Sequence, residues 1–248
     1  MTARQAVVLA AGRGTRLGAL AADTPKPLLD LAGRPLLLRT LDALAGSGIE
    51  HAIVVVGHLG DRIAAALADD PIPGLRLDLV TQHRLDGTAR ALALAAPRLD
   101  DGPFLVTWGD VFVESVNYAR LLAAAADADG ALLVNGVDDP WAGAAVYLDA
   151  GWRVTRVVEK PPRGTSATRW NNAGPAVLRP WVWPFIEALQ PSPRGEYELP
   201  RAVAAAVEAG RTLLAVPVEG PWFDIGTPES LAAARRYAEG RRGGIVQP

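Results

Sequence analysis

A glycine-rich segment followed by a lysine between two prolines is the part of the sequence that most clearly indicates chemistry. The apolar run 6–9 leads into residues 10–16 (AAGRGTR), and Lys26 follows in T-P-K-P. Small residues let backbone N–H groups approach phosphate oxygens, and a helix beginning there would add the positive end of its dipole. Arg16 and Lys26 would supply full positive charges, and Pro27 is expected to hold Lys26 in an extended backbone. The pattern favours a polyphosphate site; the alternative is an ordinary tight turn between a strand and a helix.

A second candidate loop covers residues 82–91 (QHRLDGTARA). A glutamine amide both donates and accepts hydrogen bonds, so Gln82 can pair with the imide edge of uracil or thymine. Gly87 would let a base lie against the backbone. The alternative is a loop glutamine followed by Thr88 as the N-cap of a helix.

Asp110 follows the apolar run 104–108 through a single glycine, Gly109. The carboxyl ends of parallel strands form the ligand crevice of an open sheet. A carboxylate at that place suits Mg2+, a hard ion that is held by few carboxylates and by phosphate oxygens. Gly109 would leave room for a nucleotide. The alternative is an aspartate that only caps a turn.

These loops need a framework of strands and helices, and the hydrophobic pattern predicts one. The first half alternates strands and helices, which indicates a mostly parallel sheet with helices on both faces. Its expected strands are 6–9, 52–56, 75–80, 104–108 and 130–135, and its expected helices are 35–45, 61–67, 88–96 and 118–126. The second half is mixed, with expected strands at 144–148, 154–159, 173–178 and 213–218 and expected helices at 198–208 and 229–239.

Composition narrows the class of protein. The chain has 248 residues, a net charge of −2 and no cysteine. The length fits one large α/β domain or two small ones, and the charge gives no reason to expect nucleic acid or an acidic membrane as a partner. The absence of cysteine excludes disulfides, thiolate catalysis and cysteine-based zinc sites. His51, His58 and His83 are isolated, so we expect surface or loop positions rather than metal ligands.

The sequence also indicates where the protein acts. No apolar stretch of about 18 residues is free of charges and prolines, so we expect no membrane span. The N-terminal residues enter a strand without a signal segment, and the lack of cysteine suits a reducing compartment. We therefore expect a cytoplasmic protein.

Residues 7–28 (VVLAAGRGTRLGALAADTPKPL) resemble the signature of the sugar-1-phosphate nucleotidylyltransferases, L-A-A-G-x-G-x-R-L followed by P-K-P-L. Later segments resemble further motifs of this family in the same order, up to about residue 231. They are the pyrimidine-reading loop Q-x-x-x-x-G-T-[AG] at 82–89, E-K-P at 159–161, N-[TA]-G at 172–174 and W-x-D-[IV]-G-[TD]-P at 222–228.

The resemblance implies a fold and a division of the chain. The fold would be α/β, a Rossmann-like three-layer α/β/α nucleotide-diphospho-sugar transferase fold with a mixed central sheet. One nucleotidyltransferase domain would cover 1–240, with a nucleotide-binding half at about 1–112 and a sugar-binding half at about 113–240. Residues 241–248 would be a frayed tail.

The resemblance also implies roles for the matched residues. Those that would contact the nucleotide are Leu9, Ala10, Ala11, Gly12, Gly14, Thr15, Gln82, Gly87, Thr88 and Gly109. Those that would contact the sugar are Gly143, Glu159, Asn172 and Glu196. Asp110 and Asp224 would hold one Mg2+, Lys26 and Lys160 would hold phosphates, and Arg16 would stabilise the leaving pyrophosphate. Ala142 stands where a tyrosine is common in the family, so packing against the sugar is expected to differ.

The implied reaction makes an NDP-sugar and pyrophosphate from UTP or dTTP and a sugar 1-phosphate, with Mg2+ as cofactor and in-line attack on the α-phosphate. The sequence does not indicate which sugar is used, and a monomer and a homodimer both stay open. Three alternatives also stay open: a cytidylyltransferase acting on phosphocholine or another phosphorylated alcohol or sugar, a catalytically silent regulatory protein, and a glycosyltransferase. A silent protein would be expected to lack the lysine or the aspartates, and a glycosyltransferase would typically carry D-x-D where 109–111 read G-D-V.

Overall fold

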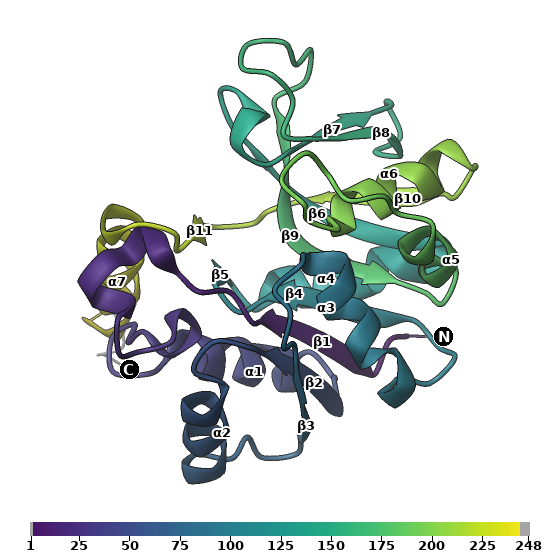
Figure 1. Cartoon of the computed structure of the whole chain (residues 1–248). Coiled ribbons are helices and arrows are strands. Elements are labelled where there is room, and N and C mark those ends of the chain that lie inside the picture. Colours follow the sequence, from purple (N-terminus) through teal and green to yellow (C-terminus); the bar gives the residue numbers. More distant parts are fainter. Residues whose placement is uncertain (1, 244–248) are drawn as a thin grey trace, which may run out of the picture.

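The structure is a computed structural model that describes residues 2–243. A nine-stranded sheet forms the centre of the protein (Figure 1). From edge to edge its main path is β10 (Leu213–Pro217), β6 (Gly130–Gly136), β9 (Trp170–Leu178), β4 (Phe104–Trp108), β1 (Gln5–Ala10), β2 (His51–Val56) and β3 (Arg76–Thr81). Strand β9 is antiparallel to β4 and β6, whereas the other neighbours on the path are parallel. The sheet is therefore mixed, as expected.

The neighbouring strands β1 and β2 form because their sequences are continuous apolar runs after one polar residue each, Gln5 and His51. All six residues of β1 and all six of β2 are buried, which is typical of parallel strands covered on both faces. Leu9 pairs with Val55 on one side and with Trp108 on the other. This register brings the loops after β1, β2 and β4 to one edge of the sheet, where the candidate residues lie.

Helices cover both faces of the sheet, because neighbouring strand residues such as Val7 and Val8 point to opposite faces. Val8 belongs to the core shared with α1 (Leu36–Gly46), α2 (Gly60–Asp69) and α4 (Val116–Ala124). Val7 belongs to the core shared with α3 (Thr88–Ala95), α5 (Val182–Glu187), α6 (Leu199–Glu208) and the hairpin of β7 (Ala144–Leu148) and β8 (Val154–Glu159). The result is a three-layer α/β/α fold.

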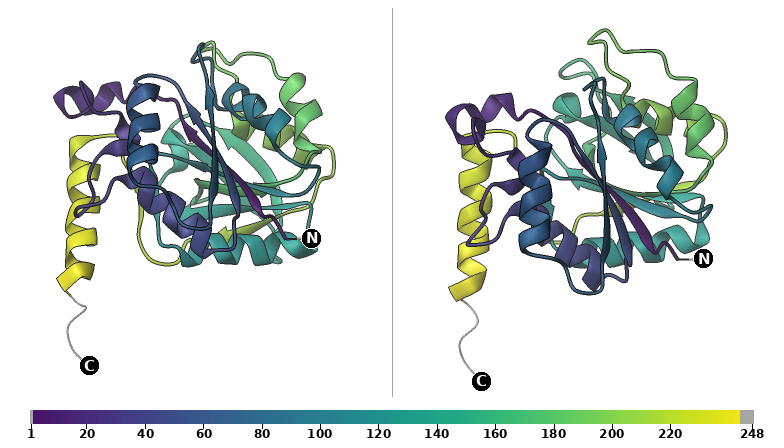
Figure 2. Two further views of the ribbon diagram at one scale, coloured as in Figure 1. Left: turned by 90° about the horizontal axis from the view of Figure 1, so that it is seen from below. Right: turned by 60° about the horizontal axis from the view of Figure 1, so that its bottom comes forward.

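The last helix of the described chain packs beside this sandwich, on the segment that follows β1. Helix α7 (Pro228–Gly243) packs through Leu231 and Ala234 against Leu17 and Ala21, and the yellow helix lies next to the purple N-terminal segment in Figures 1 and 2. A fully buried leucine stabilises the fold by about 1.5–3 kcal/mol. Strands β5 (Val111–Val113) and β11 (Trp222–Asp224) form a separate antiparallel pair. Both contacts attach the last part of the described chain to the loops at the sheet edge.

Two local predictions at the N-terminal loop are wrong. The glycine-rich segment leads into a 3-10 helix, Thr15–Ala21, and not into a regular α-helix, because Gly14 and Gly18 adopt positive φ angles of 64° and 55°. The glycine-rich segment therefore does not face the N-terminus of a regular α-helix. Lys26 is not extended, because it begins a short 3-10 helix, Lys26–Leu28, despite the proline that follows it.

Other differences from expectation lie away from this loop. His51 is buried, and it is satisfied there by Asp78, whose Oδ2 lies 2.9 Å from Nε2, and by Gln5. Helix α7 continues to Gly243, so the predicted tail begins within a helix, and 244–248 lie outside the described residues. Within 2–243, no helix is long and apolar enough to cross a membrane.

Candidate active site

Two adjoining cavities open at the edge of the sheet where the candidate loops meet. We call them the base-loop cavity, of about 350 Å³, and the hairpin cavity, of about 360 Å³. Both are lined by Trp108, Asp110, Glu159 and Pro200. Two small ligands placed in these cavities would therefore meet at Asp110.

Most of the sequence-predicted residues line one cavity or both. The base-loop cavity is lined by Leu9, Ala11, Gly12, Gln82, Gly87, Thr88, Asp110, Glu159, Lys160 and Glu196. The hairpin cavity is lined by Arg16, Asp110, Gly143, Glu159, Asn172 and Asp224. Ala10, Gly14, Thr15, Lys26 and Gly109 are outside both linings.

Lys26 lies behind the cavity wall and holds two carboxylates. Its Nζ donates to Asp110 Oδ2 at 2.6 Å and lies 3.8 Å from Asp224 Oδ1. Only 8% of the lysine side chain is exposed, so the ammonium depends on these carboxylates for its partners. Gly14 lies on its other side, where an added Cβ would come within 3.3 Å of the lysine Cβ.

Asp224 reaches this position through the β5–β11 pair, in which it lies opposite Val111. Burial and the negative charge of Asp110 raise the pKa of Asp224, while Lys26 and Arg16 oppose this rise. The two carboxylates repel each other and lie next to one ammonium. Their oxygens suit a hard divalent cation, for which phosphate oxygens would be further ligands. The described residues contain no cluster of three or more metal-ligating side chains, so the protein alone offers a partial site.

Arg16 lines the hairpin cavity beside Asp224. Its guanidinium lies against Gly226, where an added Cβ would be 3.2 Å from Nη2. Gly226 therefore provides the space that the arginine occupies. The position brings the positive charge of Arg16 to the same carboxylate that Lys26 holds from behind.

Gly109 has a packing role that the sequence did not indicate. An added Cβ there would lie 3.0 Å from the Ala10 Cβ and 3.3 Å from Pro27 Cγ. The small residues at 10 and 109 therefore let the turn after β4 approach the loop that carries Lys26. They shape the cavity wall from outside the cavity.

Gln82 is 6% exposed at the base-loop cavity. Its Nε2 lies 3.3 Å from Asp86 Oδ1 and 3.3 Å from the Gly87 carbonyl oxygen. These two contacts commit both amide hydrogens to the protein, so Oε1 is the atom with which a ligand N–H would bond. The imide N–H of uracil or thymine is a donor of that kind.

Gly87 and Thr88 are set by a distant segment of the chain. Gly87 has a φ of 120°, and an added Cβ would lie 2.4 Å from the carbonyl oxygen of Tyr197. The glycine is thus required by the Tyr197 backbone, whether or not a base lies nearby. Thr88 does not cap its own helix, because its Oγ1 accepts the N–H of Leu199 at 2.9 Å.

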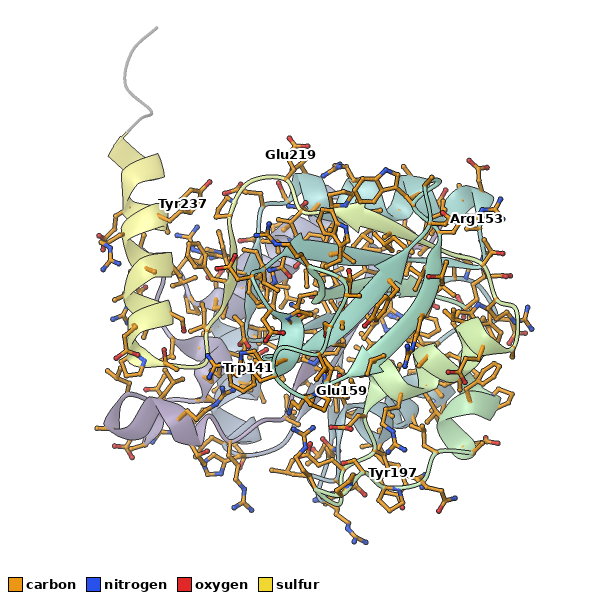
Figure 3. The ribbon with its side chains drawn as sticks, turned by 90° about the horizontal axis from the view of Figure 1, so that it is seen from above. Trp141, Arg153, Glu159, Tyr197, Glu219 and Tyr237 are labelled. Carbon is orange, nitrogen blue, oxygen red and sulfur yellow. The ribbon has the colours of Figure 1, made fainter. Side chains whose placement is uncertain are left out.

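The wall of the base-loop cavity carries an ion-pair cluster. Arg194 Nη2 lies 3.8 Å from Glu159 Oε1 and 3.7 Å from Glu196 Oε2, and it also contacts Glu198. Burial raises the pKa of Glu159 to about 7, with Arg194 opposing and Glu196 adding to the rise. Figure 3 shows Glu159 near the hairpin and Tyr197 further out, on the segment that carries Glu196 and Glu198.

Arg194 is a charged residue of this site to which the sequence assigns no role. Its only local signal is the alternation of charge in R-G-E-Y-E at 194–198. Its proximity to Glu159 depends on the fold, because β8 and the loop before α6 come together only in three dimensions.

The remaining predicted residues lie around the hairpin. Lys160 has a positive φ of 44°, and its N–H donates to the Gly143 carbonyl oxygen at 2.8 Å. An added Cβ on Gly143 would lie 2.2 Å from Asn171 Oδ1, so a larger residue there would require the Asn171 side chain to move. Asn172 uses its Oδ1 to accept the N–H of Gly174 at 3.0 Å. A positive φ on a lysine is a strained conformation of the kind that recurs at functional sites.

Comparisons with known proteins identify the family and relatives of this chain. The model of the nucleotidyl transferase family matches residues 5–240. The chain is 34% identical over 238 residues to UTP–glucose-1-phosphate uridylyltransferase AglF of Haloferax volcanii, covering 94% of this chain and 95% of that protein. It is 30% identical to a glucose-1-phosphate thymidylyltransferase of Streptomyces griseus, covering 94% of this chain and 65% of that protein.

A solved structure also resembles the fold. The structure of a UDP-glucose pyrophosphorylase complexed with UDP-glucose superposes with a TM-score of 0.85 at 18% identity, covering 97% of this chain and 100% of that one. At that level of identity, the likeness concerns the arrangement of strands and helices.

Proposed function

Because this chain belongs to the nucleotidyl transferase family, we propose that it joins UTP or dTTP to a sugar 1-phosphate, forming an NDP-sugar and pyrophosphate. The observation that carries the proposal is that the base-loop cavity and the hairpin cavity meet at Asp110, with the ammonium of Lys26 2.6 Å behind it. The nucleotide would occupy the base-loop cavity, and the sugar would occupy the hairpin cavity.

The reaction needs little covalent chemistry from the protein. An oxygen of the sugar phosphate forms a bond to the α-phosphorus, and the bond from that phosphorus to the bridging oxygen of the pyrophosphate breaks. The bonding electron pair leaves with pyrophosphate, and no general base is needed because the attacking phosphate is already ionised. Catalysis would then consist of positioning and charge stabilisation.

Four cationic side chains are proposed to act on the phosphates. Lys26 would stabilise charge at the α-phosphate, and Arg16, beside Asp224, would stabilise the pyrophosphate. Lys160 would hold the sugar phosphate where the two cavities join, since it lines the base-loop cavity next to Glu159, which lines both cavities. Arg194 lines the same cavity, and we add it as a second contact for that phosphate.

Mg2+ is the proposed cofactor, and Asp110 with Asp224 would hold it. When bound, Mg2+ would offset the negative charge of the α-phosphate and of the leaving pyrophosphate. The carboxylate pair supports this proposal. Burial and mutual repulsion disfavour two negative charges side by side, and a bound dication would offset both charges.

Base and sugar recognition would come from the two cavity walls. Gln82 would accept the imide N–H of the base through Oε1, which favours UTP or dTTP over CTP. Glu159, 13% exposed at the junction of the cavities, would accept hydrogen bonds from sugar hydroxyls. Asn172 would contact the sugar from β9. The cytoplasmic location expected from the sequence stays a prediction.

The test is a screen for pyrophosphate release with the purified full chain and Mg2+. UTP, dTTP, CTP and GTP are crossed with a panel of sugar 1-phosphates and phosphocholine. Turnover with UTP or dTTP and one sugar 1-phosphate supports the proposal and identifies the product. Turnover only with CTP and phosphocholine would replace it by the cytidylyltransferase alternative. Silence of folded protein that also binds no nucleotide in calorimetry would contradict it.

A further inference from the structure

We propose that Tyr197 and Arg90 are positioning residues that hold the base-reading loop and the Arg194–Glu198 segment together as one unit. The inference rests on the proposed function and assigns roles to two residues outside both cavity linings. Since neither side chain lines a cavity, they would act through the residues that do.

Two backbone hydrogen bonds and one bond from a backbone N–H to a side chain join the two segments. The N–H of Tyr197 donates to the Asp86 carbonyl oxygen at 2.7 Å, and the N–H of Ala89 donates to the Tyr197 carbonyl oxygen at 2.9 Å. The N–H of Leu199 donates to Thr88 Oγ1 at 2.9 Å. The loop that carries the base-reading residues is thus paired, residue by residue, with the start of α6.

The contact between the two backbones is too close for a side chain. An added Cβ at Gly87 would lie 2.4 Å from the oxygen and 2.5 Å from the nitrogen of Tyr197. The Gly87 carbonyl oxygen is also the acceptor for Gln82 Nε2 at 3.3 Å. A shift of Tyr197 would therefore move the atom that orients the Gln82 amide.

Arg90 contacts the Tyr197 ring from α3. Its guanidinium carbon lies 4.2 Å from the centroid of the Tyr197 ring, within the range of a cation–π contact. Both residues are half-buried, which makes such a contact stronger than on an open surface. Arg90 is two residues after Thr88, so the contact ties the first turn of α3 to the ring.

The same unit carries the wall that faces the sugar phosphate. Arg194 and Glu196 precede Tyr197 by three residues and one residue, and both line the base-loop cavity with Gln82 and Gly87. Loss of the Tyr197 ring would therefore loosen both the base-reading loop and the wall that carries Arg194 and Glu196. Base discrimination and affinity for the sugar phosphate should then weaken in the same variant.

The experiment compares Tyr197→Leu and Arg90→Ala with two controls. Tyr197→Phe keeps the ring, and Arg156→Ala removes a comparable cation–π contact, to Tyr147 at 5.5 Å, that lies outside both cavity linings. Calorimetry gives the ratio of UTP to CTP affinity for each protein, and steady-state kinetics give the KM for the sugar 1-phosphate and kcat. Melting temperatures separate these effects from a loss of stability.

We expect the UTP-to-CTP ratio to fall and the KM for sugar 1-phosphate to rise, each by about five- to tenfold, in Tyr197→Leu and Arg90→Ala. Tyr197→Phe and Arg156→Ala should stay within about twofold of the natural chain. An unchanged ratio in Tyr197→Leu, even with a lower melting temperature, would overturn the inference. Because the ratio is a binding measurement, it decides the inference even if the turnover screen rejects the proposed reaction.

Discussion

The ammonium of Lys26 lies 2.6 Å from Asp110 Oδ2, although 84 residues separate them in the chain. The same ammonium is 3.8 Å from Asp224 Oδ1. One buried cation thus organises two carboxylates that come from opposite halves of the sequence. The charge balance of the site depends on this group.

Removal of the Lys26 charge should therefore cost most of the activity. We expect Lys26→Ala to lower kcat/KM for pyrophosphate release by at least about 100-fold, the scale of losing one electrostatic stabiliser. Lys26→Met, which keeps more of the buried volume, should lose activity to a similar degree. If either variant retains more than about a tenth of the activity, Lys26 does not act on the reacting phosphates.

Asp224→Asn should affect the dependence of activity on Mg2+ more strongly than it affects the stability of the fold. Since burial and Asp110 raise the pKa of Asp224, loss of its charge removes a repulsion, and the melting temperature without Mg2+ should not fall. The Mg2+ concentration for half-maximal activity should rise by about tenfold or more, because a charged ligand is lost. Asp42→Asn, which removes a carboxylate paired with Arg34 far from the cavities, is the control. An equal response to Mg2+ in both variants would argue against a metal at Asp224.

Glu159 should make stability depend on pH in an unusual direction. Its folded-state pKa is about 7 against 4.5, so between these values the folded protein binds more protons than the unfolded chain. The free energy of unfolding should fall as pH rises through this window, by on the order of 3 kcal/mol in total. Glu159→Gln should remove this loss and be more stable than the natural chain at pH 8.

Denaturant titrations at pH 5 and pH 8 measure this effect. The exposed Glu208→Gln variant on α6 is matched in charge change and serves as the control. If Glu159→Gln and the natural chain lose the same stability between the two pH values, the Glu159 carboxyl is not the cause. The stabilised variant should still lose activity, because a neutral amide is a weaker acceptor for sugar hydroxyls.

Gly87→Ala should be far more disruptive than Gly74→Ala. Both glycines have positive φ angles, 120° and 76°, but space is open around Gly74, whereas a Cβ on Gly87 would meet the Tyr197 backbone at 2.4 Å. Gly74→Ala should cost about 1–2 kcal/mol from backbone strain alone. Gly87→Ala should cost more and should raise the KM for UTP, which Gly74→Ala leaves unchanged. Equal losses in unfolding free energy would mean that the loop yields to the added methyl group.

Several parts of this fold could be predicted from the sequence because burial leaves a direct pattern. The run AIVVV at 52–56 indicates a strand buried on both faces, and it lies in β2. The glycine-rich turn after β1 and the aspartate after β4 were placed at the same sheet edge by the rule for open parallel sheets. The structure brings Asp110 and Gln82 to the same cavity.

Other parts of the fold and of the site leave no pattern in the local sequence. The strands β5 and β11 are only three residues long, too short for a periodic pattern, and their pairing joins distant segments. Helix α5 contains Pro184 within a Trp-rich segment, which conceals its helical character. The position of Arg194 depends on its ion pairs with three carboxylates, one of which, Glu159, belongs to β8. Contacts of this kind follow from tertiary packing and not from local sequence.

The β5–β11 pair has a consequence for how the protein is made. During synthesis Asp110 emerges long before Asp224, and only the pairing of Val111 with Asp224 brings the second carboxylate to Lys26. The carboxylate pair beside Lys26 is therefore complete only after β11 has been synthesised and has paired with β5.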